Sequence, residues 1–256
     1  MSLYLISFSP TGSTRRVLDL LAKGWENEPY EVVELCSAEP VRPIEFTAED
    51  VCLVGAPVYG GRIPAMQADR LKELFGECRG NGCRAVGVAV YGNRDFDDAL
   101  VELRDILVEG GCRFVAGITA VAEHSIVRVY GAGRPDEADA KELLSFGKQI
   151  REAMQKEMLT EPQIPGNRPY KEGGKGGPHP LPNENCVRCG QCARKCPAAA
   201  ISADGQQLDE TKCISCMRCI SVCPKGARHL PAELLAGLEQ RLKPVCSERK
   251  ENKLYL

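Results

Sequence analysis

Eight of the fourteen cysteines lie between Cys186 and Cys223, in two runs with the same spacing. Each run reads C-x2-C-x2-C-x3-C-P, and the second follows the first by 27 residues. Three closely spaced thiolates can bind one iron–sulfur cluster, while in two-cluster proteins the fourth thiolate binds the other cluster. The spacing therefore predicts two [4Fe–4S] clusters. One is ligated by Cys186, Cys189, Cys192 and Cys223, and the other by Cys213, Cys216, Cys219 and Cys196.

Zinc is the alternative metal for closely spaced cysteines. A structural zinc site needs only two Cys-x2-Cys pairs separated by a spacer. It does not require a third and a fourth cysteine at fixed intervals, twice, each time followed by proline. The pattern therefore favours iron–sulfur, and eight cysteines favour [4Fe–4S] over three-iron clusters. The other six cysteines are scattered without such spacing. We expect Cys36, Cys52, Cys83 and Cys112 to be buried and Cys246 to be a free thiol, and Cys78 is the sixth.

A second candidate site is the loop Ser9-Pro10-Thr11-Gly12-Ser13-Thr14, which joins a predicted strand to a predicted helix. Hydroxyl groups, backbone N–H groups and the positive end of a helix dipole together favour a phosphate group. The loop has neither the G-K-[ST] of a Walker A motif nor the G-x-G-x-x-G of dinucleotide-binding loops. An ordinary Ser/Thr helix cap is the alternative interpretation.

The elements that position these residues alternate along the first 158 residues. Apolar runs predict strands at 3–8, 30–36, 51–54, 83–91 and 114–122, and helical periodicity predicts helices at 12–23, 64–75, 95–108 and 136–158. Continuously apolar strands are covered on both faces, and their alternation with helices implies a parallel sheet between two helical layers. We therefore expect a five-stranded, doubly wound α/β domain with ligands at the carboxyl ends of its strands.

With this topology, the 9–14 loop resembles the flavodoxin pattern [ST]-x-T-G-x-T, and the resemblance to flavodoxin-like domains covers residues 1–155. It implies that FMN binds with its phosphate in this loop and its ring against the loops after the third and fourth strands. The residues so assigned to FMN are Ser9, Thr11, Gly12, Ser13, Thr14, Pro57, Val58, Tyr59, Gly60, Gly61, Tyr91, Gly92, Asn93, Arg94 and Phe96. Tyr59 and Tyr91 as plain surface tyrosines remain the alternative.

Residues 184–230 resemble the bacterial two-cluster ferredoxins, which have an α+β fold, but carry seven Lys/Arg against four Asp/Glu. A basic face would suit an acidic partner, although it could equally dock on its own flavin domain or face solvent. Taken whole, the chain resembles the flavodoxin–ferredoxin fusion proteins of anaerobic bacteria known as EFR1-type. The resemblance implies low-potential electron transfer and names no partner.

The predicted organisation is a flavodoxin-like FMN-binding domain at 1–158, a Pro/Gly-rich linker at 159–183, the two-cluster domain at 184–230, and a helix and tail at 231–256. A flexible linker of that length would span roughly 25–30 Å. A segment pinned along the domain surface is the alternative. The net charge of −2 argues against nucleic-acid binding. The sequence contains no apolar run of about 18 or more residues, so we expect no membrane span. No signal peptide is recognisable, which predicts a cytoplasmic protein.

The predicted function is a relay of electrons between the two clusters and FMN, with redox proteins as partners: a ferredoxin, a reductase or an acceptor enzyme. The alternative is an FMN-dependent reductase of a quinone, nitro compound or enone, with a pocket formed by Tyr59, Arg62, Arg94 and His124. A redox sensor is a third possibility. No catalytic residue is predicted.

Overall fold

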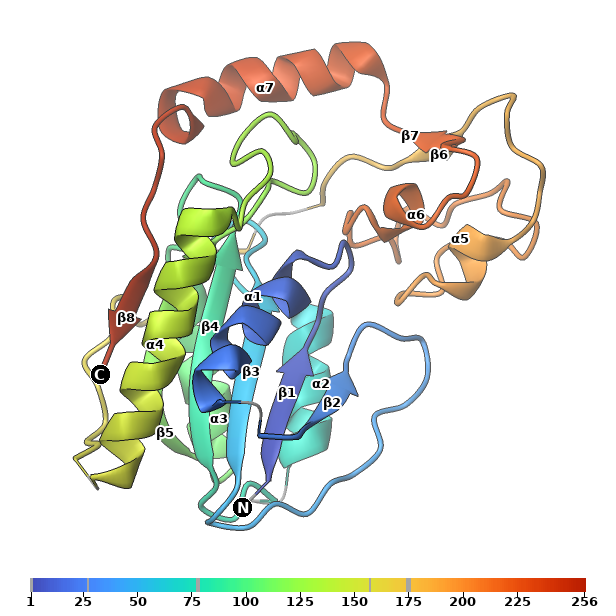
Figure 1. The fold of residues 1–256 in the computed structure, drawn as a ribbon. Helices are drawn as coiled ribbons and strands as arrows, with labels where there is room; N and C mark the ends of the chain where they lie inside the picture. Colours follow the sequence, from blue (N-terminus) through green and yellow to red (C-terminus); the bar gives the residue numbers. More distant parts are fainter. Residues whose placement is uncertain (1, 27, 77–78, 157, 174–175) are drawn as a thin grey trace.

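The computed structural model describes residues 2–26, 28–76, 79–156, 158–173 and 176–256 (Figure 1). The first part of the chain forms β1 (Leu3–Ser7), α1 (Ser13–Ala22), a 3-10 turn (Lys23–Trp25), β2 (Tyr30–Glu34), β3 (Val51–Pro57), α2 (Ala65–Phe75), β4 (Arg84–Tyr91), α3 (Ala99–Glu109), β5 (Arg113–Val121) and α4 (Glu137–Gln155). The remainder forms β6 (Leu181–Pro182), α5 (Gln191–Arg194), α6 (Arg218–Ser221), β7 (Arg228–His229), α7 (Ala232–Cys246) and β8 (Lys253–Tyr255). Within this described part, no helix is both long and apolar enough to cross a bilayer.

The main sheet has the order β2-β1-β3-β4-β5-β8 within the described residues. Its first five strands are parallel, in the 2-1-3-4-5 order of flavodoxin-like domains. The predicted flavodoxin-like α/β class is confirmed. The expected five-stranded sheet gains a sixth strand, because Lys253–Tyr255 pairs antiparallel with β5. Three residues are too few to show a strand period, so the sequence gives no signal for β8.

Two helical layers enclose the sheet. Helices α1 and α4 cover one face, and α2 and α3 cover the other (Figure 1). The core therefore has two halves: Leu18 and Leu143 pack with the apolar side chains of one face, and Leu71 and Leu103 with those of the other. A doubly wound sheet of this kind leaves the carboxyl ends of its strands free to form a site.

Helix α3 begins at Ala99, four residues later than the predicted start at 95. Asn93 and Asp97 adopt left-handed backbone conformations, with φ of 64° and 43°, which the first turn of an α-helix cannot contain. The loop after β4 is thereby lengthened. Helix α4 ends at Gln155, short of the predicted 158, and α7 ends at Cys246, within the predicted helix and tail at 231–256.

The chain from residue 181 to residue 230, here called the cysteine module, repeats its backbone as well as its sequence. Residues with left-handed φ recur 27 positions apart, at Arg188 and Ser215 and again at Gly190 and Met217. The one-turn helices α5 and α6 stand at the same interval. Strands β6 and β7 pair and close the module. The internal repeat is therefore structural.

Residues 159–173, here called the strap, lie along the first domain, as the alternative interpretation of the linker anticipated. The Asp98 carboxylate accepts the backbone N–H groups of Asn167 and Lys171, at 2.8 and 2.7 Å. Asp105 forms an ion pair with Arg168 and accepts the Tyr170 hydroxyl. Gly174 and Lys175 of the predicted linker lie outside the described residues.

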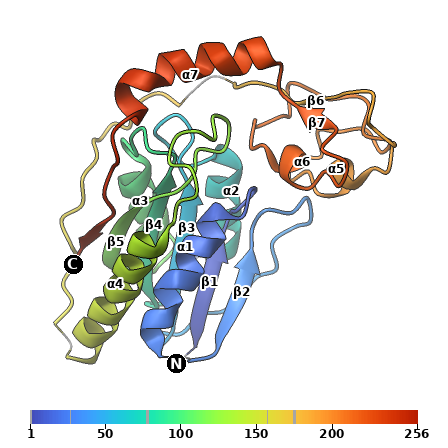
Figure 2. The ribbon, with the colours of Figure 1, turned by 45° about the horizontal axis from the view of Figure 1, so that its top comes forward.

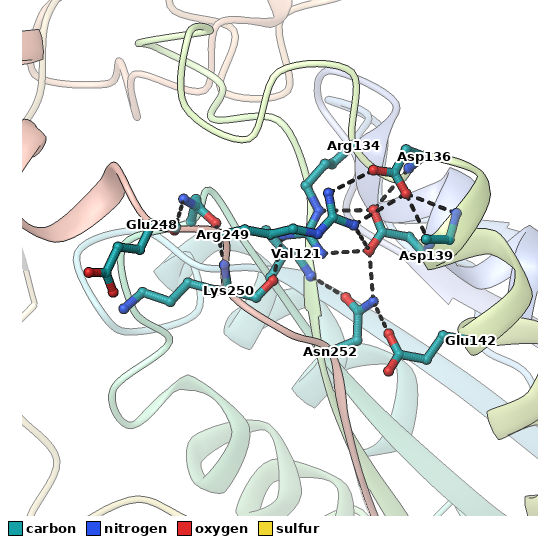
Figure 3. A network of polar contacts seen from close by, with 11 residues as sticks. Val121, Arg134, Asp136, Asp139, Glu142, Glu248, Arg249, Lys250 and Asn252 are labelled. Atoms are coloured by element: carbon teal, nitrogen blue, oxygen red, sulfur yellow. Dashed lines mark hydrogen bonds and ion pairs between the residues drawn. The ribbon is translucent and has the colours of Figure 1, made fainter.

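Helix α7 crosses above the carboxyl ends of the strands and leads into residues 247–256, here called the tail (Figures 1 and 2). Figure 3 shows how the tail is held. The side chain of Asn252 accepts the Val121 N–H at 2.8 Å and donates to Asp139 at 3.0 Å. Asp139 also receives the buried guanidinium of Arg134, at 2.9 and 2.5 Å. The end of the chain is thus bound into the sheet and α4.

Candidate functional site

The eight repeated cysteines line two separate cavities. The first is lined by Cys186, Cys189, Cys192 and Cys223. The second is lined by Cys196, Cys213, Cys216 and Cys219. We call these thiol sets the outer site and the inner site. The structure therefore groups the cysteines as the spacing predicts, with the fourth cysteine of each run exchanged, while their role as ligands stays a prediction.

The donor set of each site fits an iron–sulfur cluster. Four thiols are the ligand set of a [4Fe–4S] cluster, and in each site they surround a space rather than one point. Among the described residues, no three potential ligands lie close enough together to hold a single metal ion. The arrangement suits a group with several irons.

Polar hydrogens are aimed at the sulfurs. The backbone N–H of Ala200 donates to Cys196 Sγ at 3.4 Å, and that of Ala227 donates to Cys223 Sγ at 3.2 Å, again 27 residues apart. The outer site has a further side-chain donor, Gln206 Nε2, at 3.1 Å from Cys186 Sγ. Such bonds stabilise negative charge on sulfur and tune the reduction potential of a bound cluster.

The inner site faces the first domain. Arg218 Nη1 donates to the carbonyl oxygens of Ser9 and Pro10, at 3.3 and 3.4 Å, and lies 3.3 Å from Cys36 Sγ. Ile214 packs against the core on the α2/α3 side of the sheet. The inner thiols thereby stand next to the predicted phosphate loop.

Three adjoining cavities lie at the carboxyl ends of the strands. The central cavity is lined by Pro10, Thr11, Ser13, Thr14, Pro57, Val58, Tyr59, Val90, Tyr91, Gly92, Ala122, Glu123 and Ser125. These residues follow β1, β3, β4 and β5, so that four loops distant in sequence converge on one space. This edge is where doubly wound domains bind ligands.

The phosphate loop is shaped for close approach. Gly12 has φ of +91°, and a side chain there would meet no atom within 4 Å, so the space above its backbone is open. Thr11, Gly12 and Ser13 line a cavity, whereas the hydroxyl of Ser9 accepts the Arg15 N–H at 3.0 Å and so caps helix α1. The helix-cap alternative thus holds for Ser9.

Tyr59 and Tyr91 both line the central cavity. Burial raises the pKa of Tyr59 well above its usual value, and burial with the nearby Asp95 carboxylate raises the pKa of Tyr91 to about 12. Both hydroxyls are therefore protonated at neutral pH. Burial, with the charge of Arg94, lowers the pKa of His124, whose Nδ1 accepts the N–H groups of Ile126 and Val127. The imidazole is neutral and held in place.

The tyrosine cavity, of about 580 Å³, extends from Tyr59 toward the module and the strap. Its wall includes Tyr59, Arg62, His124, Ile214 and Ser215. The arginine cavity, of about 510 Å³, lies on the other side, between the phosphate loop and α6.

Several lining residues were not predicted. The arginine cavity includes Arg16, Glu123, Ser125, Arg128 and Arg134. Four of these five follow β5, the fifth parallel strand. The rule that ligands bind beyond the carboxyl ends of the strands would have pointed to that loop.

Five residues predicted to contact FMN line none of the three cavities: Ser9, Gly61, Asn93, Arg94 and Phe96. The contact of Asn93 with FMN stays a prediction, while its amide donates to the carbonyl oxygens of Cys246 and Glu248 and accepts the Lys250 N–H. It binds the tail. Arg94 forms an ion pair with Asp97, and Phe96 packs edge-on against Tyr91.

Four of the scattered cysteines are buried as expected. Cys52, Cys83 and Cys112 lie together in the core on the α2/α3 side of the sheet. The Sγ–Sγ distance is 3.8 Å between Cys52 and Cys83 and 3.5 Å between Cys83 and Cys112. Cys36 is buried beside Arg218, and Cys246, expected to be a free thiol, packs with Val127 and is also buried. Cys78 lies outside the described residues.

Residues 185–227 match the family of 4Fe-4S dicluster domains. The match spans all eight repeated cysteines. The cysteine module is therefore a domain for two [4Fe–4S] clusters, with a role in electron transfer. No curated protein matches the chain.

The solved structures that resemble the chain include flavodoxins. An archaeal flavodoxin is 14% identical, with 60% of this chain and 99% of that chain covered and a TM-score of 0.44. The Megasphaera elsdenii flavodoxin is 16% identical (59% and 99% covered, TM-score 0.40), and a Fusobacterium nucleatum flavodoxin bound to flavin mononucleotide is 18% identical (61% and 96% covered, TM-score 0.43). At such values, the fold assignment rests on the strand order and connectivity described above.

Proposed function

We propose that this chain is a low-potential electron-transfer flavoprotein that relays electrons between two [4Fe–4S] clusters and FMN. The observation that carries the proposal is the arrangement of its sites: the inner thiols adjoin the phosphate loop, and the outer thiols lie beyond them. In this proposal residues 1–158 bind FMN, 159–183 connect, 184–230 hold the clusters, and 231–256 form the helix and tail. The fusion order supports membership of the EFR1-type family.

The residues at the strand ends fit FMN. The N-terminus of α1 with Thr11, Gly12, Ser13 and Thr14 would hold the phosphate, because N–H groups, hydroxyls and the helix dipole all favour an anion. Tyr59 and Tyr91 both line the central cavity, and aromatic side chains suit a flat ring system. When bound, FMN exchanges one or two electrons and each cluster exchanges one.

The chain's own contribution is positioning. Arg218 links the inner site to the backbone of the phosphate loop, and the strap and tail tie both ends of the module to the first domain. A fixed separation between redox sites suits a carrier. We further propose a cytoplasmic location, because free thiols in such density persist in reducing compartments.

A reductase acting on a small acceptor is the second candidate. The observation that favours it is the tyrosine cavity, whose wall contains Tyr59, Arg62 and His124 of the predicted pocket. Arg94 does not line it. Saturable turnover of one quinone, nitro compound or enone would favour this function over the carrier.

Stepwise anaerobic reduction of the purified protein tests the relay. We expect about eight iron atoms and one FMN per chain, assayed on the same sample, with both chromophores bleached in steps. Zinc in place of iron, or the absence of flavin, would refute the relay. Fast exchange with redox proteins and slow turnover of every small acceptor would distinguish carrier from reductase.

A further inference from the structure

The outer site carries exposed positive charge. Arg188, Arg194, Lys195 and Lys225, here called the basic face, are all exposed. Lys225 lines the outer cavity, and Arg194 Nη1 donates to the Cys189 carbonyl oxygen at 2.9 Å. Lys225 and Arg194 therefore lie at the outer thiols, and Arg188 directly precedes Cys189 in the sequence.

An exposed apolar side chain, that of Val187, also lies at the outer site. Val187 is 59% exposed, and its neighbour Cys189 is an exposed outer thiol. Both line the outer cavity. A small apolar contact ringed by charge is the pattern of transient redox encounters, in which charges steer the partner and a small contact permits rapid release.

The opposite side of the module is already occupied. Besides Arg218, Arg70 of α2 donates to the carbonyl oxygen of Pro197, at 3.4 Å. Figures 1 and 2 both show α6 nearer the sheet than α5. The basic residues of the module therefore fall into two groups. Arg218 docks on the first domain, whereas the four residues of the basic face point away from it.

We propose that the basic face is the docking surface for a small acidic electron-carrier protein, which exchanges electrons at the outer site. The proposal rests on the proposed function and adds the entry point and the partner's charge. In each exchange with a reduced carrier, the carrier loses one electron and the module gains one, with no bond made or broken. The choice of partner follows from charge complementarity, since the basic face offers four cations and Asp204 is the acidic residue lining the outer cavity.

The test is binding of an oxidised acidic bacterial two-[4Fe–4S] ferredoxin to the full-length, cluster-loaded protein, measured by calorimetry. Affinity should fall between about 20 and about 300 mM salt, because salt screens exposed charges. The double variant Arg188→Glu/Lys225→Glu should bind about tenfold more weakly at low salt. The control Arg241→Glu/Lys243→Glu changes the same charge at exposed positions of α7 and should bind like the unaltered protein.

Iron content is measured on every variant. If the glutamate variant loses iron, Arg188→Gln/Lys225→Gln repeats the test with a smaller expected loss of affinity. Salt-independent binding, or equal weakening by the α7 control, would overturn the docking surface. Electron transfer followed in parallel separates the two proposals. Transfer that is insensitive to these variants refutes the docking surface alone, whereas no transfer with any carrier refutes the relay.

Discussion

The outer and inner sites have the same cysteine spacing and opposite surroundings. In the outer site Cys189 and Val187 are exposed, while at the equivalent inner positions Cys216 is buried and Ile214 packs against the core of the first domain. Position 191 is a half-exposed glutamine, and its counterpart at 218 is the arginine that grips the phosphate loop. The same repeated unit thus serves two purposes: its inner copy forms an interface with the first domain, and its outer copy forms an exposed surface.

The largest expected effect is loss of iron from one site at a time. Cys189→Ala and Cys216→Ala should each lower the iron content by about half, because each removes a proposed ligand of one cluster. Only Cys216→Ala should also reduce bound flavin, since Cys216 lies close to Tyr59 at the interface. Iron, sulfide and flavin assays on both variants check this. Equal flavin loss in the two would contradict the distinction between the sites.

Loosening the tail should make the inner site as accessible to solvent as the outer site. Asp139→Asn leaves the Arg134 guanidinium, which is 4% exposed, without its ion-pair partner, and should destabilise the protein by about 3–5 kcal/mol. Thermal unfolding measures the loss, and an iron chelator measures access to each site. The control Asp69→Asn, at an exposed position of α2, should change stability by less than about 0.5 kcal/mol. Unchanged chelation of the inner site would show that the tail does not maintain docking.

The arginine at the interface has an intermediate expected effect. Arg218→Gln removes the bonds to the Ser9 and Pro10 carbonyl oxygens, and flavin affinity should fall about tenfold, or about 1.4 kcal/mol. Fluorescence titration of the flavin-free protein measures it. Gln191→Ala, the same position of the repeat in the outer half, should leave flavin affinity unaltered. A comparable loss in both variants would mean that Arg218 acts through folding of the module and not through the loop.

The smallest expected effect concerns the potentials of the two sites. Gln206→Leu removes the side-chain donor to Cys186 Sγ and should lower the potential of the outer site by about 20–60 mV, if the bond gains about 0.5–1.5 kcal/mol on reduction. The inner potential should not move. Redox titration followed by electron paramagnetic resonance resolves the two. A shift confined to the inner site would reverse the assignment of the thiol sets.

How far the sequence leads depends on the range of the interactions. The phosphate loop is predictable because its residues are neighbours in sequence, and the thiol grouping is predictable because the spacing of each run and the exchange of the fourth cysteine follow a known pattern. Asn93 shows the limit, because it lies in a loop that suits a flavin but bonds to the tail, more than 150 residues away in sequence. Nothing near Asn93 indicates that partner. Nor does the composition of the strap, rich in Pro and Gly, indicate that Asp98 and Asp105 hold it in place.

The pairing of β8 with β5 has a consequence for how this protein could be re-engineered. The chain leaves the first domain after the strap and returns to its sheet at Lys253, so the cysteine module is inserted within that domain and is not appended to it. Trimming the chain after Cys223, the last of the eight repeated cysteines, would therefore remove an edge strand as well as α7. A foreign redox module grafted here needs two splice junctions, one in the strap and one before Asn252. A module grafted in this way would leave the sheet intact and would be connected to the first domain at both of its ends.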